Sequence, residues 1–211
     1  MSRPHLQPTG PPVKLSSIPH YLASPLRIWD QWHYQRFLSR NPEVPWISRG
    51  CIEYLDGVLT QDMRALEWGS GRSTRWYARR VAHILSVEHD STWHATVTER
   101  LRALENAECR LIPLEHPVSA PTRAQYDPLP KYVAVAQSFD RESLGFVVVD
   151  GHYRQACVRA ALDRLRPGGL LLIDNSNWLT PEEWGVPSTW HLRHQSGDRA
   201  AFSTVWQKPI R

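Results

Sequence analysis

The 211-residue chain carries a formal net charge of +4 at pH 7, and 41% of its residues are hydrophobic, as is usual for a chain that folds as one domain. It has no apolar run that could span a bilayer and no dense stripe of Lys and Arg with interleaved aromatic residues, so we expect neither a membrane nor a nucleic-acid partner. Its three cysteines, Cys51, Cys109 and Cys157, match no zinc or CxxC spacing, which favours reduced thiols in a cytoplasmic protein.

The N-terminal part divides into two segments. Residues 1–25 are rich in proline and lack the apolar stretch of a secretory signal, so we interpret them as a flexible tail. Residues 26–63 form an accessory helical segment in our prediction. The spacing of Leu26, Trp29 and Phe37 predicts a helix over 26–38, and Ser48 is the expected cap of a second helix.

From residue 64 to 211 the pattern changes to short strands alternating with amphipathic helices. The expected strands are Ala65–Trp68, His83–Glu88, Arg110–Leu114, Phe146–Asp150 and Leu170–Asp174. Those that are apolar throughout are buried on both faces, which is typical of a parallel sheet with helices on either side.

Two helices and a hairpin complete this segment. One helix begins at Asp90 or Ser91, and a second carries Val158, Ala161, Leu162 and Leu165 before a Pro-Gly-Gly end. The stretches His191–Gln195 and Phe202–Gln207 flank a Ser-Gly-Asp turn and predict an antiparallel hairpin. We therefore predict an α/β, doubly wound, Rossmann-like domain over residues 64–211.

The loop after the first strand is the strongest local motif. Gly69 and Gly71 lie between a strand and a helix, where glycines let the backbone approach a ligand and the helix offers free N–H groups. Nineteen residues after Gly69, Glu88 ends the second strand, where an acid can accept both hydroxyls of a ribose. The alternative interpretation needs no ligand: the glycines would only form a tight turn, and Glu88 would only cap the next helix.

These features also fit NAD binding, but three details favour another ligand. The third glycine of the dinucleotide fingerprint is missing, since the turn reads Gly-x-Gly-x-x-Thr. Glu67 precedes the first glycine by two residues, where it can face a cationic or amino-bearing ligand. The chain ends in a hairpin and not in a second mononucleotide-binding half.

The order and spacing of the motifs from 64 to 207 resemble the class I S-adenosylmethionine (SAM)-dependent methyltransferases. The motifs are Glu67-Trp68-Gly69-Ser70-Gly71, Ser86-Val87-Glu88-His89-Asp90, Val147-Val148-Val149-Asp150-Gly151 and Ile173-Asp174-Asn175. The resemblance implies a seven-stranded, mostly parallel sheet with an antiparallel last strand. It also implies that SAM is the cofactor, with Glu88 on its ribose and Glu67 near its methionine end. The residues implied in cofactor binding are Glu67, Gly69, Ser70, Gly71, Ser73, Thr74, Glu88, His89 and Asp150.

Polar residues at the tips of the fourth and fifth strands are the candidates for chemistry. Asp150, Asp174 and Asn175 offer oxygen ligands that would suit Mg²⁺, and this arrangement is similar to that of cation-dependent O-methyltransferases. The lysine that those enzymes carry after the first acid is absent. Without a metal, Asp150 would contact the amino group of SAM or cap a helix, and Asp174-Asn175 would be an ordinary turn.

His152, directly after the same strand, is our candidate for the general base, with Asp150 as its catalytic neighbour, because its ordinary pKa near 6.5 suits proton transfer at neutral pH. The sequence thus predicts methyl transfer from SAM to a small-molecule acceptor, most simply a hydroxyl. The alternatives are an N-methyltransferase or RNA methyltransferase of the same fold, a non-catalytic SAM-binding protein, and an NAD-dependent oxidoreductase. A homodimer is a further possibility that the sequence leaves open.

Overall fold

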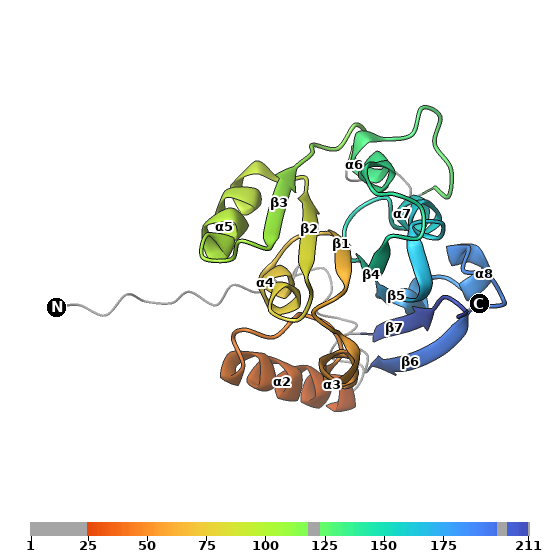
Figure 1. The fold of residues 1–211 in the computed structure, drawn as a ribbon. Helices are drawn as coiled ribbons and strands as arrows, with labels where there is room; N and C mark the ends of the chain where they lie inside the picture. Colours follow the sequence, from red (N-terminus) through yellow and green to blue (C-terminus); the bar gives the residue numbers. More distant parts are fainter. Residues whose placement is uncertain (1–24, 118–122, 198–201, 211) are drawn as a thin grey trace.

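A seven-stranded sheet with the strand order β3-β2-β1-β4-β5-β7-β6 forms the centre of the computed structural model (Figure 1). The structure describes residues 25–117, 123–197 and 202–210. The predicted flexible tail lies outside these residues except for Pro25. Within the described residues, no helix is both long and apolar enough to cross a membrane.

Five strands pair in parallel, and a hairpin that pairs antiparallel closes the sheet. The parallel strands are β1 (Arg64–Trp68), β2 (His83–Glu88), β3 (Ala107–Leu111), β4 (Leu144–Val149) and β5 (Leu165–Asp174). The hairpin of β6 (His191–Gly197) and β7 (Phe202–Gln207) follows, with β7 antiparallel to both β5 and β6. This topology confirms the predicted Rossmann-like sheet and its antiparallel end.

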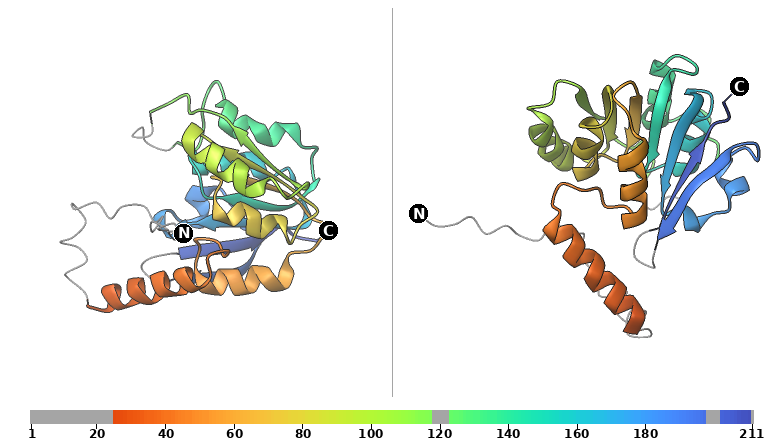
Figure 2. Two further views of the ribbon diagram at one scale, coloured as in Figure 1. Left: turned by 90° about the vertical axis from the view of Figure 1, so that its left-hand side faces the viewer. Right: turned by 60° about the horizontal axis from the view of Figure 1, so that its bottom comes forward.

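Helices cover both faces of the sheet, as the apolar strands require. One face packs against α3 (Arg49–Val58) and α4 (Arg72–Ala78), through side chains such as Ile52, Leu55 and Trp76. The other face packs against α6 (Lys131–Ala134), α7 (Arg154–Ala161) and α8 (Pro181–Trp184). The short 3-10 helices η2 (Val135–Ser138) and η3 (Ser176–Trp178) follow α6 and β5. α5 (Ser91–Leu101) begins after Asp90, whose side chain caps it. The helices thus form two layers with the sheet between them (Figure 2).

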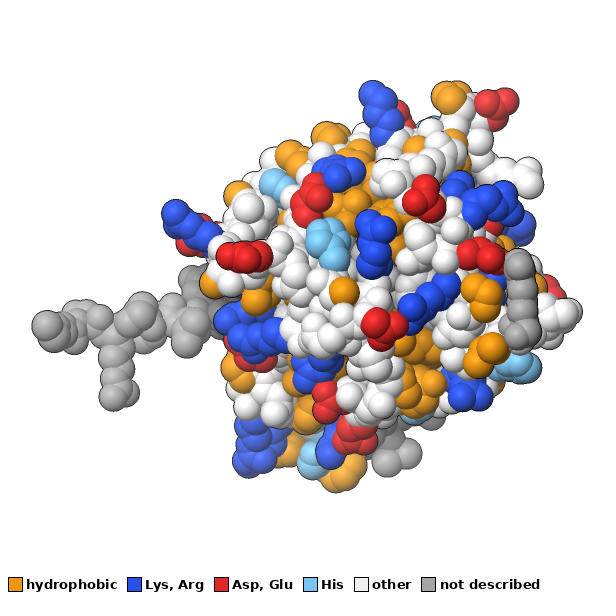
Figure 3. All heavy atoms as spheres, in the orientation of Figure 1, with side chains coloured by type: hydrophobic (Ala, Val, Ile, Leu, Met, Phe, Trp, Pro, Cys, Tyr) orange, Lys and Arg blue, Asp and Glu red, His pale blue; other side chains and the backbone are white. Residues whose placement is uncertain are grey.

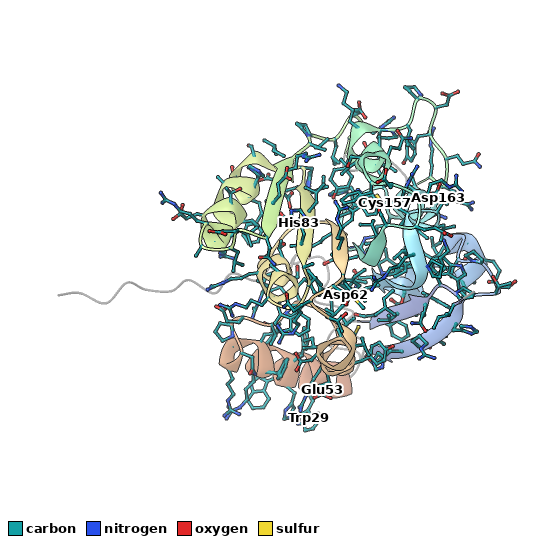
Figure 4. The ribbon with its side chains drawn as sticks, viewed as in Figure 1. Trp29, Glu53, Asp62, His83, Cys157 and Asp163 are labelled. Carbon is teal, nitrogen blue, oxygen red and sulfur yellow. The ribbon has the colours of Figure 1, made fainter. Side chains whose placement is uncertain are left out.

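The first described helix, α2 (Pro25–Arg40), projects beyond the sheet (Figure 2). Leu38 near its end is buried, whereas Trp29 and Trp32 are 61% and 54% exposed, and Trp29 points away from the body of the molecule (Figure 4). Both predicted N-terminal helices are therefore present, but only the second contributes several residues to the core. Over the face seen in Figure 3, acidic and basic side chains are interspersed.

Two predicted boundaries were wrong. The third strand is Ala107–Leu111 and not Arg110–Leu114, because Ile112 and Leu114, which suggested a strand, pack against the core from the loop that follows it. Leu165 was assigned to a helix, yet it begins β5 and pairs with Leu144, while α7 ends at Ala161. All three cysteines are free, and Cys51 and Cys157 are buried, as predicted for reduced thiols.

Candidate functional site

The loops after β1 and β4 touch each other, and both depend on glycine at the contact. Gly69 has a φ of +93°, and a Cβ built on it would lie 2.7 Å from the backbone nitrogen of Gly151. A Cβ on Gly151 would lie 2.1 Å from the hydroxyl oxygen of Tyr132. The backbone N–H of Asp150 donates to the carbonyl of Trp68 over 2.9 Å, which ties the two strand ends together. Larger residues at these positions would push the loops apart.

Glu67 lies beneath the glycine loop and is fully buried. Three hydroxyls donate to its carboxylate: Ser73 over 2.7 Å, Thr74 over 2.6 Å and Ser86 over 2.7 Å. Burial raises the pKa of Glu67 to about 7, and the three hydrogen bonds oppose that rise. In the structure this acid therefore contacts the loop and the start of α4, and it does not line a cavity.

Glu88, at the end of β2, is held by the chain that follows it. Its Oε1 accepts from the backbone N–H groups of His89 and Asp90 over 2.8 and 2.9 Å, and its Oε2 accepts from the Ser70 hydroxyl over 2.9 Å. The side chain is 4% exposed. Glu88 is thus a fixed carboxylate that is joined to the glycine loop through Ser70 and borders a cavity at the edge of the sheet.

The main cavity, so named here because Glu88 and His152 line it, has a volume of about 630 Å³ and opens at the carboxyl ends of the parallel strands. Of the residues predicted to bind a cofactor, it is lined by Gly69, Ser70, Glu88, His89 and Asp150. Gly71 and Ser73 line a smaller cavity of about 170 Å³ that shares Gly69, Ser70 and Asp150 with the main one. Glu67 and Thr74 line neither cavity. The predicted residues therefore gather around one place, but two of them lie behind its wall.

An arginine, Arg154, lies at the tips of β4 and β5, where the sequence suggested a metal site. The guanidinium of Arg154 donates to the side chain of Asp150 over 2.8 Å and to its carbonyl over 2.9 Å. Asp174 is buried and accepts from the Ser203 hydroxyl over 2.8 Å. In the part of the chain that the structure describes, no group of three or more His, Cys, Asp or Glu side chains could hold a metal ion. The prediction of Asp150, Asp174 and Asn175 as Mg²⁺ ligands therefore gains no support, because Arg154 already donates to the side chain of Asp150 and Ser203 to that of Asp174.

The two acids at these tips, Asp150 and Asp174, both have a raised pKa. Burial, with the neighbouring Asp174 carboxylate, raises the pKa of Asp150, and the Arg154 guanidinium opposes that rise. Burial likewise raises the pKa of Asp174. Two nearby carboxylates in a poorly solvated place cannot both ionise at their usual pH.

His152 lines the main cavity, where the sequence placed a general base. Burial lowers its pKa below 6.5, and the neighbouring His89 and Arg154 act in the same direction. The imidazole is therefore neutral at pH 7, the form that accepts a proton.

Aromatic side chains that the sequence did not predict as a unit line part of the cavity. The rings of Tyr126 and Tyr153 meet at 5.1 Å between centroids, and His116 donates its backbone N–H to the Tyr153 hydroxyl over 3.0 Å. Trp93 donates its indole N–H to the carbonyl of Ser70 over 2.8 Å, and Trp178 is 64% exposed at the edge. Tyr153 and Trp178 could be anticipated, since each follows a strand tip, whereas Tyr126 comes from a long connection without a motif.

No protein-family model matches the sequence. No curated protein matches it either. Solved structures do match the fold. A methyltransferase from Geobacter sulfurreducens is 13% identical with a TM-score of 0.57, over 94% of this chain and 98% of that one. An rRNA methylase from Streptococcus thermophilus is 16% identical with a TM-score of 0.55, over 78% of this chain and 99% of that one. SMU.1697c from Streptococcus mutans, whose structure contains SAH (S-adenosylhomocysteine), is 12% identical with a TM-score of 0.53, over 74% of this chain and 94% of that one.

These likenesses show that the chain has the Rossmann-like fold of methyltransferases, as the sequence motifs suggested. They do not show the narrower resemblance to cation-dependent O-methyltransferases.

Proposed function

We propose that the chain is a SAM-dependent methyltransferase that acts on a small hydroxylated molecule. The observation that carries the proposal is the position of Glu88: a fixed carboxylate at the tip of β2, joined to the glycine loop by Ser70 and bordering a cavity at the carboxyl edge of the sheet. On a fold shared with methyltransferases, an acid in that position is suited to a ribose diol.

The residues present fit SAM as a cofactor. Gly69 has no side chain where the loops after β1 and β4 meet, so its backbone can approach the methionine part of SAM closely. The Oε2 atom of Glu88 keeps acceptor capacity, because it offers two lone pairs and accepts from the Ser70 hydroxyl, whereas two backbone N–H groups already engage Oε1. When bound, SAM supplies a methyl group on a sulfonium, and its transfer is an in-line displacement by the acceptor oxygen.

His152 is proposed as the base that takes the acceptor's proton. It lines the cavity, and its lowered pKa leaves it neutral at pH 7. Asp150 is proposed to contact the amino group of SAM, because it borders both the main cavity and the smaller one. A general base contributes about 10²–10⁴-fold to such a step.

The size and lining of the cavity favour a small acceptor. About 630 Å³ must hold the cofactor and the acceptor together, and drug-sized ligands alone occupy cavities of roughly 300–1,000 Å³. The rings of Tyr126, Tyr153 and Trp178 offer flat apolar surface, so we propose an acceptor that carries a ring with a hydroxyl group.

The test is transfer itself. The full-length chain is incubated with SAM labelled on its methyl group and with a panel of phenols, sugars, amines and RNA, and the product SAH is quantified. We expect SAH to accumulate with a hydroxylated ring compound and the label to be recovered on its oxygen. Label recovered on nitrogen or on RNA would overturn the acceptor class, and binding of SAH without turnover on any acceptor would point to a non-catalytic SAM-binding protein.

A further inference from the structure

The oxygen atoms at the tips of β4 and β5 converge on a single side chain, Arg154, at the start of α7. Its Nε–H donates to the carbonyl of Gly151 over 3.0 Å. One terminal nitrogen donates to the carbonyl and the side chain of Asp150 over 2.9 and 2.8 Å. The other donates to the carbonyl of Asp174 and, over 3.4 Å, to Oδ1 of Asn175.

These hydrogen bonds use the whole guanidinium. Arginine has five N–H donors, and here they meet five oxygen acceptors, of which three are backbone carbonyls. The indole ring of Trp178 covers one face of the group, with 4.9 Å from Cζ to the ring centroid. The side chain is 12% exposed. Arg154 therefore has no donor left for a substrate, and its contribution must come through the residues that it holds.

A cluster of carboxylate, amide and carbonyl oxygens is what a hard divalent cation binds. A guanidinium cannot lose its proton in a protein. A divalent ion that approached Asp150 or Asn175 would thus meet the permanent positive charge of a group that already donates to Oδ1 of each side chain.

We infer that Arg154 is a built-in cation that replaces a divalent metal at the tips of β4 and β5. It is a positioning residue: it balances the charge of Asp150 and fixes the turn of residues 151–153, from which His152 reaches the cavity. That turn includes Tyr153 in a left-handed conformation, with φ at +53°, which a non-glycine residue adopts only when its surroundings hold it there. The role in methyl transfer rests on the proposed function, whereas the replacement of a metal does not.

The test is whether removal of Arg154 creates a metal site. Thermal unfolding and isothermal titration with Mg²⁺ and Mn²⁺ are measured on the full-length wild type and on Arg154→Ala, without SAM or acceptor. We expect the melting temperature of the wild type to be unchanged by millimolar metal or by EDTA. Millimolar metal should raise that of the variant by roughly 3–5 °C, as binding to the folded state alone does. Adding Asp150→Asn to the variant should abolish this response.

Arg141→Ala is the matched control, since Arg141 is an exposed arginine with one ion pair to Asp163, and it should stay insensitive to metal. If Arg154→Ala does not fold, Arg154→Gln, which keeps a shorter polar side chain without the charge, replaces it in the same assay. A divalent ion bound by the wild type in one-to-one ratio at this place would overturn the inference, as would a folded neutral variant that gains no metal response. Neither result depends on whether the chain transfers methyl groups.

Discussion

The rings of His89 and His152 meet edge to face, with 4.4 Å between their centroids, and so join the tips of β2 and β4 across the main cavity. His89 also places its Nδ1 2.9 Å from Oε1 of Glu88. His89 therefore contacts both Glu88, the acid proposed to hold the ribose, and His152, the proposed base. His89 and Arg154 both lower the pKa of His152, so this contact helps to keep His152 neutral.

The first prediction concerns His152. Replacing it by Ala should lower turnover by about 10²–10⁴-fold, because the general base is lost, while the Kd for SAH stays within about twofold. In the wild type, turnover should rise with pH through a pKa below 6.5 and level off near pH 7, since only the neutral imidazole accepts a proton. His191→Ala, which alters an exposed histidine of β6, is the control. An unchanged rate for His152→Ala would remove the residue from the mechanism.

The second prediction concerns Glu88. The substitution Glu88→Gln keeps the shape of the side chain but removes the charge, and hydrogen bonds to a charged group contribute about 1.5–3 kcal/mol. We expect calorimetry to show SAH affinity weakened by roughly 10–100-fold. Glu99→Gln on the surface of α5, where the side chain is 73% exposed, should leave affinity unchanged. Equal affinities for wild type and Glu88→Gln would show that the ribose is not bound there.

A third prediction compares alanine substitutions at two glycines, Gly69 in the loop after β1 and Gly57 in α3. Gly69→Ala places a methyl group 2.7 Å from the Gly151 nitrogen, in a backbone conformation with φ at +93°. Strain of this kind costs roughly 1–3 kcal/mol before the clash is counted, so the melting temperature should fall by about 5 °C or more and SAH binding should be lost. Gly57→Ala, where no atom beyond the chain neighbours and the backbone of the same helix lies within 4 Å of the added Cβ, should be neutral or slightly stabilising. Similar behaviour of the two variants would contradict the tight contact of the loops.

Much of the fold could be predicted from the sequence because buried parallel strands are apolar throughout and the terminal hairpin alternates. The third strand was misplaced because it lies at the sheet edge, where its exposed residues carry little pattern, and because Ile112 and Leu114 pack from outside it. The start of β5 was missed because Pro167-Gly168-Gly169 resembles a helix end, although Gly168 donates its N–H to the carbonyl of Lys208 beside the strand.

The site was predicted in part. Motif spacing located Glu88, Asp150 and His152 around one cavity, since strand tips meet at one edge of a parallel sheet. Spacing could not show that Glu67 faces inward, because its hydroxyl partners come from α4 and β2 and become neighbours only in the folded chain. The role of Arg154 was also missed. Its one signal is the four-residue separation from Asp150, which any helix start would produce.

The fourth prediction follows from Glu67. Its pKa is about 7 in the folded state and near 4.5 when exposed, so the folded state binds the proton more tightly between these values. Stability from this group is therefore complete below about pH 4.5 and is lost as pH rises to about 7. Replacing Glu67 by Gln should remove a decline of roughly 3 kcal/mol over that window. Denaturant unfolding from pH 5 to 8 measures it, with the surface variant Glu53→Gln as control. If stability changed with pH in the same way in wild type and in Glu67→Gln, the raised pKa of a buried Glu67 would be contradicted. Asp150 and Asp174 are present in both proteins, so their titration cancels in the comparison.

The central claim is that the cavity beside Glu88 binds the SAM scaffold. Thermal unfolding of the full-length chain with SAH and with NAD tests it most directly, because a ligand of the folded state raises the melting temperature and other compounds do not. We predict a rise of several degrees with SAH, reduced in Glu88→Gln and kept in Glu99→Gln, and no rise with NAD. A rise with NAD alone, or none with SAH, would contradict the account.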